Sequence, residues 1–240
     1  MSSLGKRSAG GYGANKRARA GSVSYPRTSM AKSGRYNRRF GTRRMPLQRA
    51  PGVSGETGFL DVASASYALD TTGSVTLLNT VPQGTSVNQR VGKKMNLKSL
   101  QFRGNLGANS AALVNDVAFM IVYDKRPTGA LPAVTDILAF ANSNAMNNDA
   151  NSGRFVFMKR HDDILIGNTS AAASFTDSAV KACDYFLNLK GMPTVYKAAG
   201  TGAIGDIEQG ALYLVTVGNN AAGTSAASKT GTFRLRFQDA

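Results

Sequence analysis

Cysteine, histidine and tryptophan are nearly missing from this 240-residue sequence, which has one Cys, one His and no Trp. With Cys183 alone, an intramolecular disulfide is excluded and a reducing compartment is indicated. His161 has no cysteine partners with which to hold zinc, so no metal site is expected. No apolar run approaches the roughly 18 residues of a membrane span, and no apolar signal segment follows the first charges, so we expect no membrane partner.

Acidic residues are missing from the first 55 positions, and the first one is Glu56. The same stretch carries 13 of the 29 Lys and Arg residues, so it holds about +13 of the +15 net charge, and the remaining 16 basic and 14 acidic residues nearly balance. The basic residues are Lys6, Arg7, Lys16, Arg17, Arg19, Arg27, Lys32, Arg35, Arg38, Arg39, Arg43, Arg44 and Arg49. Because Gly, Ser and Pro interrupt them, residues 1–55 are predicted to form a disordered basic arm before one folded domain at residues 56–240.

The localised charge of the arm indicates a polyanion as its partner. Aromatic residues, among them Tyr36 and Phe40, are interleaved with the cations, and such a mixture binds the phosphates and the bases of a single-stranded nucleic acid. The alternative is a solvated basic linker that has no ligand. Lys16, Arg17 and Arg19 also resemble a nuclear import signal, so this cluster is interpreted either as an address for an import receptor or as part of the phosphate-binding arm.

Catalytic and cofactor motifs find no support in the sequence. Residues 200–205 spell G-x-G-x-x-G, but a dinucleotide site needs a long helix after the last glycine, and here a short stretch leads into an expected strand. Cys183 is more simply a small buried hydrophobe than a nucleophile paired with His161. Asp162 and Asp163 are neighbours, so in a strand they point to opposite faces and cannot share a proton. We expect no enzyme activity and no cofactor, and a cation site of these carboxylates in an assembly is a minor alternative.

The chain after Glu56 consists of short β-rich segments separated by turn residues. The expected strands are residues 58–69, 75–81, 95–106, 116–123, 154–160, 164–166, 184–189, 194–197, 211–217 and 232–238, with a turn at 70–73. A short helix at Asp136 to Ala141, with Thr135 as its N-cap, is expected in a long connection. About eight antiparallel strands without βαβ alternation predict a jelly-roll sandwich. An immunoglobulin-like sandwich is the alternative, which the missing Trp and second Cys disfavour.

Two expected strands show which of their faces is polar. Residues 232–238 alternate strictly, so Phe233, Leu235 and Phe237 are expected to face the core, with Arg234 and Arg236 on the opposite face. The strand 95–106 has a basic side, formed by Lys93, Lys94, Lys98 and Arg103. Both strands are therefore expected to present cations to solvent or to a ligand.

An ordered series of short segments resembles a known family. These segments are residues 75–79, 83–86, 90–94, 98–99, 120–125, 133–138, 205–207, 210–214 and 234–237. In this order they resemble capsid proteins of small circular Rep-encoding single-stranded DNA viruses and, more distantly, geminivirus coat proteins. The resemblance covers most of residues 56–240, and the arm matches the basic amino terminus of the family in character.

The resemblance implies a capsid subunit that self-assembles, with about 60 copies in a small icosahedral shell, and packages circular single-stranded DNA. It places the protein in the virion and, during assembly, in the nucleus of the host. The last strand of such a jelly roll borders the shell interior, so Arg234 and Arg236 are expected to face the cargo. The alternative is that they are solubilising charges on an exposed strand or partners of a neighbouring carboxylate. The alternatives are a cellular nucleic-acid-binding module of β type, a capsid protein of an RNA virus and an enzyme on a jelly-roll scaffold.

Overall fold

The computed structural model describes residues 57–108, 114–167, 180–198, 200–222 and 227–239. All of these residues belong to one unit of the chain, which begins at residue 49. The basic arm therefore lies outside the described residues. Among the helices in the described ranges, none has the length and apolar character needed to cross a membrane.

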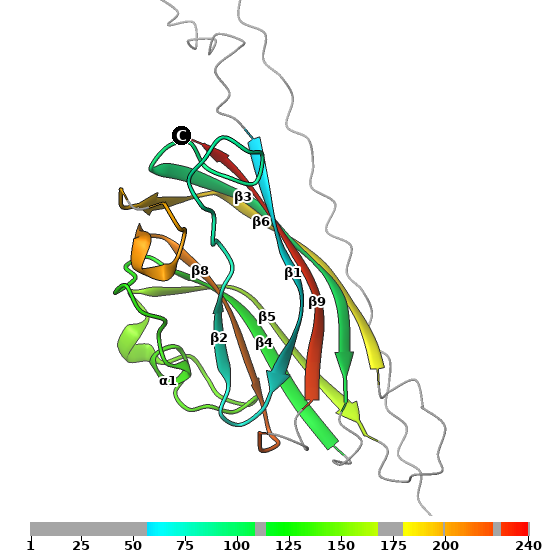
Figure 1. Ribbon diagram of the computed structural model, residues 1–240. Helices are drawn as coiled ribbons and strands as arrows, with labels where there is room; N and C mark the ends of the chain where they lie inside the picture. Colours follow the sequence, from blue (N-terminus) through cyan, green and yellow to red (C-terminus); the bar gives the residue numbers. More distant parts are fainter. Residues whose placement is uncertain (1–56, 109–113, 168–179, 199, 223–226, 240) are drawn as a thin grey trace, which may run out of the picture. The chain divides into compact units, whose positions relative to one another are not determined.

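The domain is formed by two antiparallel sheets that face each other (Figure 1). The strands are β1 (Thr57–Leu69), β2 (Ser74–Leu77), β3 (Lys94–Gly107), β4 (Val114–Asp124), β5 (Phe155–Ile166), β6 (Val180–Tyr196), β7 (Ile207–Gln209), β8 (Ala211–Gly218) and β9 (Ala227–Asp239). One sheet has the order β1-β9-β3-β6-β7 and the other the order β2-β8-β4-β5. In the first sheet the first strand pairs with the last, from Thr57 opposite Gln238 to Leu69 opposite Ala227.

This strand order is that of a jelly roll. Six long-range pairings place β1, β9, β3 and β6 in one sheet and β2, β8, β4 and β5 in the other, as two interleaved Greek keys require. The short strand β7 is an addition to the edge of the first sheet, next to β6. The prediction of an antiparallel jelly roll is confirmed, whereas β7 was not predicted.

Two pairs of expected strands are each a single long strand. The expected strands 154–160 and 164–166 are joined in β5, which pairs with β4 along its whole length. The expected strands 184–189 and 194–197 are joined in β6, in which Lys190 and Gly191 have positive φ values of 53° and 75°. These two residues form an irregularity opposite Lys98, where the register with β3 shifts, so the strand bends and continues to pair.

The predicted helix at 136–141 is wrong in its position. Helix α1 runs from Val134 to Ile137, and its N-cap is Ala133. Thr135 lies inside the helix and does not cap it. After Ile137 the backbone turns extended and pairs with the following loop, since the N–H of Ala139 donates to the carbonyl of Met146 over 2.9 Å. The helix ends early because these loop pairings replace the next turn.

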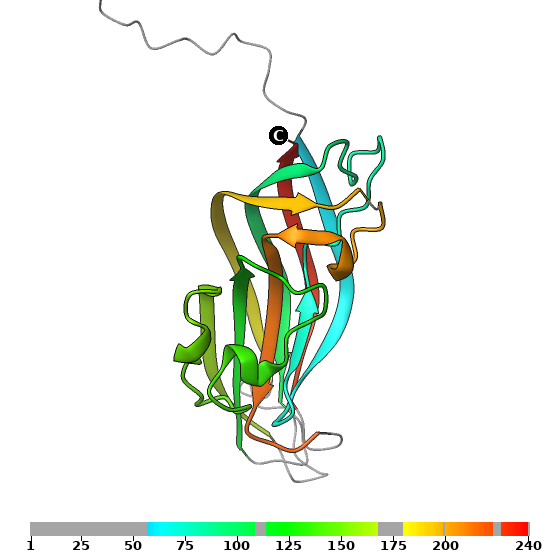
Figure 2. The ribbon, with the colours of Figure 1, turned by 90° about the vertical axis from the view of Figure 1, so that its left-hand side faces the viewer.

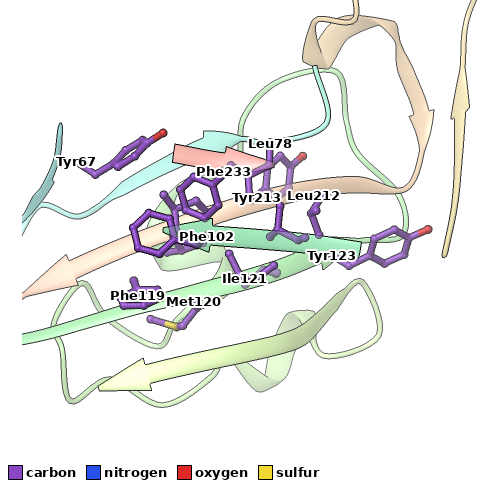
Figure 3. Packing of buried hydrophobic residues seen from close by; sticks show 14 of the residues in the cluster. Tyr67, Leu78, Phe102, Phe119, Met120, Ile121, Tyr123, Leu212, Tyr213 and Phe233 are labelled. Carbon is purple, nitrogen blue, oxygen red and sulfur yellow. The ribbon is translucent and has the colours of Figure 1, made fainter. Parts of the chain in front are cut away.

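The core lies between the sheets, and its side chains come from both of them (Figure 3). Phe102 of β3 packs against Phe233 of β9 with ring centroids 4.6 Å apart, and against Phe119 of β4 across the sandwich at 6.5 Å. Phe233, Leu235 and Phe237 are all at most 1% exposed, so the predicted inward face of β9 is confirmed. Burial of such side chains is worth about 1.5–3 kcal/mol each.

The two sheets differ in what covers their outer faces. The connection between β4 and β5, which contains α1, lies over the outer face of the four-stranded sheet (Figures 1 and 2). Arg160 of β5 holds it there, since its guanidinium donates to the carbonyls of Ser143 and Ala145 over 2.6 Å each. Met120 and Val122, which alternate with the core-facing Phe119 and Ile121, are therefore also buried, and β4 is covered on both of its faces. The outer face of the five-stranded sheet instead carries exposed side chains on β1, β3, β6 and β9.

Candidate nucleic-acid interface

We define the outer-sheet face as the side of the five-stranded sheet that points away from the core. Its members follow from the pleat, because residues that alternate with the buried ones point outward. On β9 these are Arg234, which is exposed, and Arg236, which is half-buried. Both predicted arginines thus lie on the face opposite Phe233 and Leu235, as the alternation predicts. Whether nucleic acid reaches them stays a prediction.

The strand register places the side chains of this face in transverse rows. One row is Asp61, Arg234, Gln101 and Phe186, from β1 through β9 and β3 to β6. The next is Phe59, Arg236, Ser99 and Asn188. A third contains Thr232, Arg103 and Asp184. Neighbouring strands are about 4.8 Å apart, so one row spans about 14 Å from β1 to β6.

Arg234 makes a two-point ion pair with Asp61 of the neighbouring strand. Its Nε donates to Oδ1 and its Nη2 to Oδ2 of the carboxylate, each over 2.7 Å. The Arg234 guanidinium lowers the pKa of the Asp61 carboxyl, chiefly through this hydrogen bond and also through its charge, and the charge of Arg236 adds to the effect. The same guanidinium lies 5.0 Å from the ring centroid of Phe59. Arg234 is therefore oriented by two side chains of β1, and it does not extend freely into solvent.

The remaining charges of the outer-sheet face are mostly positive. Arg103 lies 3.4 Å from Asp184, and both side chains are more than half exposed, so this ion pair is open to water. Lys98 of β3 is exposed on the same side, at the register shift. A shallow depression of about 240 Å³ is lined by Asp61, Gln101, Arg103, Thr232 and Arg234. Of the basic side predicted for this strand, Lys98 and Arg103 are thus exposed on β3, which pairs with β9, whereas Lys93 lies before the strand.

Two aromatic rings on this face were not predicted. Phe186 of β6 is 63% exposed and Phe59 of β1 is 38% exposed. Their signal was present in the sequence, since Phe186 alternates with the inward-facing Tyr185 and Leu187, but an exposed Phe in a β pattern is normally assigned to the core. The combination of rings and guanidiniums resembles the composition that suggested nucleic-acid binding for the arm.

The arm residues cannot be placed on this face. All thirteen basic residues from Lys6 to Arg49, together with Tyr36 and Phe40, lie outside the described residues. The cluster Lys16, Arg17 and Arg19 lies there too. Binding of nucleic acid and of an import receptor by these residues stays a prediction.

A buried lysine in the core was also missed. Lys229 of β9 is 0% exposed, and its Nζ lies 3.3 Å from the ring centroid of Phe119 and 3.9 Å from that of Phe102. Tyr185 and Phe233 complete the cage at 5.3 and 4.8 Å. Within the described part of the chain this Nζ has no hydrogen-bond partner. Burial lowers the pKa of the Lys229 amine from 10.5 to about 7, while the Cys183 thiol acts in the opposite direction.

The structure describes the surroundings of the motifs that were set aside. The G-x-G-x-x-G stretch is followed by a single 3-10 turn at Ile204–Asp206 and by β7, so the helix of a dinucleotide site does not follow it. Cys183 is 7% exposed within β6, and burial raises the pKa of its thiol. Asp162 pairs with Arg160 at 2.8 Å and Asp163 with Lys181 at 2.6 Å, on opposite faces of β5. No group of three metal-ligating side chains occurs in the described ranges.

Double-sheet jelly rolls occur in viral capsid proteins as well as in lectin domains and cupins. The chain belongs to the Geminivirus coat protein/nuclear export factor BR1 family, whose pattern matches residues 7–240. It is 28% identical over 190 residues to the capsid protein of Miscanthus streak virus (isolate 91), covering 70% of this chain and 74% of that relative. The protein is therefore a viral capsid protein, and its place is the virion.

Solved structures of viral shells are also similar to this chain. Desmodium yellow mottle tymovirus matches with a TM-score of 0.30 and 12% identity over 78% of this chain and 91% of that chain. The 60-mer BFDV capsid protein matches with a TM-score of 0.31 and 8% identity over 78% of this chain and 94% of that chain. The strand order of the two sheets by itself defines the jelly roll.

Proposed function

We propose that this capsid protein packages single-stranded DNA through two surfaces, the basic arm and the outer-sheet face. The arm supplies most of the net charge, and a polyanion binds to such a segment with release of counterions. The resemblance to viral jelly rolls implies that the sheet containing the last strand borders the shell interior. Arg234 and Arg236 then stand on the cargo side, beside Arg103 and Lys98. The observation that supports this proposal best is the positive balance of the outer-sheet face.

The shell contains about 60 copies of the chain in this proposal. Sixty arms at about +13 each would bring 60 × 13, or about 780, positive charges into the particle, which neutralises a strand on the order of 10³ nucleotides at one charge each. A very small genome fits this amount of charge. Assembly takes place in the nucleus. The protein enters the nucleus through an import receptor that binds Lys16, Arg17 and Arg19 of the arm.

The arm is tested by deleting residues 1–49. The truncated chain should keep the fold of the jelly-roll domain and lose most of its affinity for single-stranded DNA, because the rest of the chain is nearly neutral. Binding is measured by fluorescence anisotropy with a labelled oligonucleotide over a series of salt concentrations. An unchanged affinity and an unchanged salt slope would contradict a role of the arm in packaging.

The ion pair between Arg234 and Asp61 allows a sharper test of the sheet. Arg234→Ala and Asp61→Asn both break the pair, but the first removes a positive charge and the second releases one. If the face binds DNA, shells of Arg234→Ala, also combined with Arg236→Ala, package less DNA, and Asp61→Asn shells package at least as much as the wild type. The measurement is the ratio of nucleic acid to protein in purified shells.

A matched control is Lys125→Ala combined with Arg126→Ala, which removes two exposed cations that follow β4 of the other sheet. This variant should package a normal amount of DNA. If Arg234 serves only its ion pair, Arg234→Ala and Asp61→Asn will lose stability alike and neither will change packaging, which would leave the arm as the sole packaging element.

A further inference from the structure

The outer-sheet face offers flat apolar rings as well as charges, and the rings need a different explanation from the charges. Phe186 lies in the interior of β6, paired with Gln101 of β3, and is 63% exposed. A large aromatic side chain at the middle of a long strand normally packs on a neighbour. Its neighbours along the strand on this face are Asp184 and Asn188, both exposed and polar, so an uncovered ring is displayed between polar side chains.

The surroundings of Phe186 favour a nucleic acid as the molecule that covers it. Phe186 shares its transverse row with Arg234, and the two positions lie about 10 Å apart because two strand spacings separate β6 from β9. The row of Arg236 is the next one along the strands. Asp61 of β1 and Asp184 of β6, the acids that share rows with the arginines, each face an arginine. With Lys98, Arg103, Arg234 and Arg236 against these two carboxylates, the face is positive. A positive surface with an exposed ring is complementary to a strand whose phosphates and bases are both accessible.

The second ring is already held in place for such a role. Phe59, at 38% exposure, lies in the row of Arg236, and the Arg234 guanidinium lies 5.0 Å from its ring centroid. Contact of a guanidinium with one part of the ring fixes the orientation of both groups. Phe59 and Phe186 therefore lie on the two sides of the arginine pair, on β1 and β6 respectively, with the guanidiniums between them.

We propose that Phe186, assisted by Phe59, is a base-stacking platform on the outer-sheet face, and that it recognises unpaired nucleobases without regard to their sequence. This inference rests on the proposed packaging function and adds to it the class of ligand. Every base has a π-face, so stacking tolerates any sequence, while a duplex keeps its bases stacked internally and cannot use the ring. The platform therefore selects single-stranded over double-stranded DNA, which phosphate contacts alone do not.

The test compares two strands that differ only in their bases. The full chain is titrated with a labelled oligo(dT) of about 20 nucleotides and with an abasic strand of the same length, at salt high enough to weaken phosphate contacts. The wild type should prefer oligo(dT). Phe186→Ala should lower the affinity for oligo(dT) roughly 5- to 100-fold, the worth of one stacked base, and leave binding of the abasic strand unchanged. Phe186→Leu, which keeps apolar area without a ring, should behave like Phe186→Ala.

Phe140→Ala is the matched control, because Phe140 has a similar exposure of 52% but belongs to the connection over the other sheet. It should bind both strands like the wild type. Photo-cross-linking of shells packed with 5-iodouracil DNA should also yield a cross-link on the peptide that contains Phe186. Cross-links confined to peptides of residues 1–49 would overturn the proposal.

The outcomes separate this inference from the packaging function. If the wild type binds both strands equally and with a steep salt dependence, packaging through charge stands and the stacking platform is wrong. If it binds neither strand, the packaging function itself is wrong. If Phe186→Ala stops assembly of shells in the absence of nucleic acid while Phe186→Leu assembles normally, the ring is covered by a second copy of the chain, and this outcome also overturns the proposal.

Discussion

Replacing Lys229 by Met should stabilise the domain and flatten its pH dependence. The amine is 0% exposed and has aromatic rings in place of hydrogen-bond acceptors among the described residues, so its charged form is disfavoured in the folded state. Methionine has a similar length, carries no charge and packs well against aromatic rings. The titratable groups His161 of β5 and Cys183 of β6 interact electrostatically with the amine.

The size and direction of the effect follow from the pKa of Lys229. Burial lowers this pKa from 10.5 to about 7, a difference that corresponds to about 5 kcal/mol at most. Between these pH values the unfolded chain binds a proton that the folded chain does not, so the free energy of unfolding of the wild type rises with pH there. Below pH 7 both states bind the proton and the full cost of burying the charge is present. Attraction between the ammonium and the faces of Phe119 and Phe102 offsets part of this cost.

The assay is urea unfolding of unassembled subunits, followed by circular dichroism at several pH values from 6 to 10. Lys229→Met should exceed the wild type in free energy of unfolding by about 1–4 kcal/mol at pH 6, and the difference should shrink as the pH rises toward 10. Lys98→Met, which removes an exposed lysine of β3, should keep the pH dependence of the wild type. If Lys229→Met has the same pH dependence as the wild type, or is the less stable protein at pH 6, burial does not dominate and the aromatic cage stabilises the charge.

Three further changes test the core and the arm. Asn79→Ala should lower the free energy of unfolding by about 3 kcal/mol in urea titrations. The reason is that the side chain of Asn79 pairs with the Leu212 N–H and the Gly210 carbonyl in the core. Asn147→Ala, at an exposed position, should change the free energy of unfolding little. Asp124→Ala should cost about 3–5 kcal/mol, since the buried carboxylate holds Arg154 at 2.7 Å, and a loss no larger than that of the exposed Asp149→Ala would contradict this. A reporter fused to residues 1–20 should enter nuclei under the microscope, and changing Lys16, Arg17 and Arg19 to Ala should stop entry; import that persists would remove the cluster as an address.

Strand pattern and core face could be read from the sequence because they depend on neighbours along the chain. The alternation of Phe233, Leu235 and Phe237 with two arginines predicted the inward face of β9 correctly. The predicted turn at 70–73 is also local, since the Asp70 Oδ1 accepts a hydrogen bond from the Gly73 N–H over 2.8 Å. The same alternation, extended back by four residues, places Lys229 on the inward face. The sequence did not reveal this burial, because a lysine is normally assigned to the surface and three of the four rings around it come from other strands.

Sequence by itself determined the class of this protein: the arm carries most of the net charge, the missing cysteine and histidine clusters disfavour catalysis, and the ordered segments resemble viral capsid proteins. Tertiary structure alone decided which side chains meet on the outer-sheet face. Asp61 and Arg234 are 173 positions apart, and they pair because β1 lies beside β9. The physical reason is that the pleat is a local property of the backbone. Strand order instead depends on pairing between segments that lie far apart in the sequence, and no local pattern specifies which segments pair.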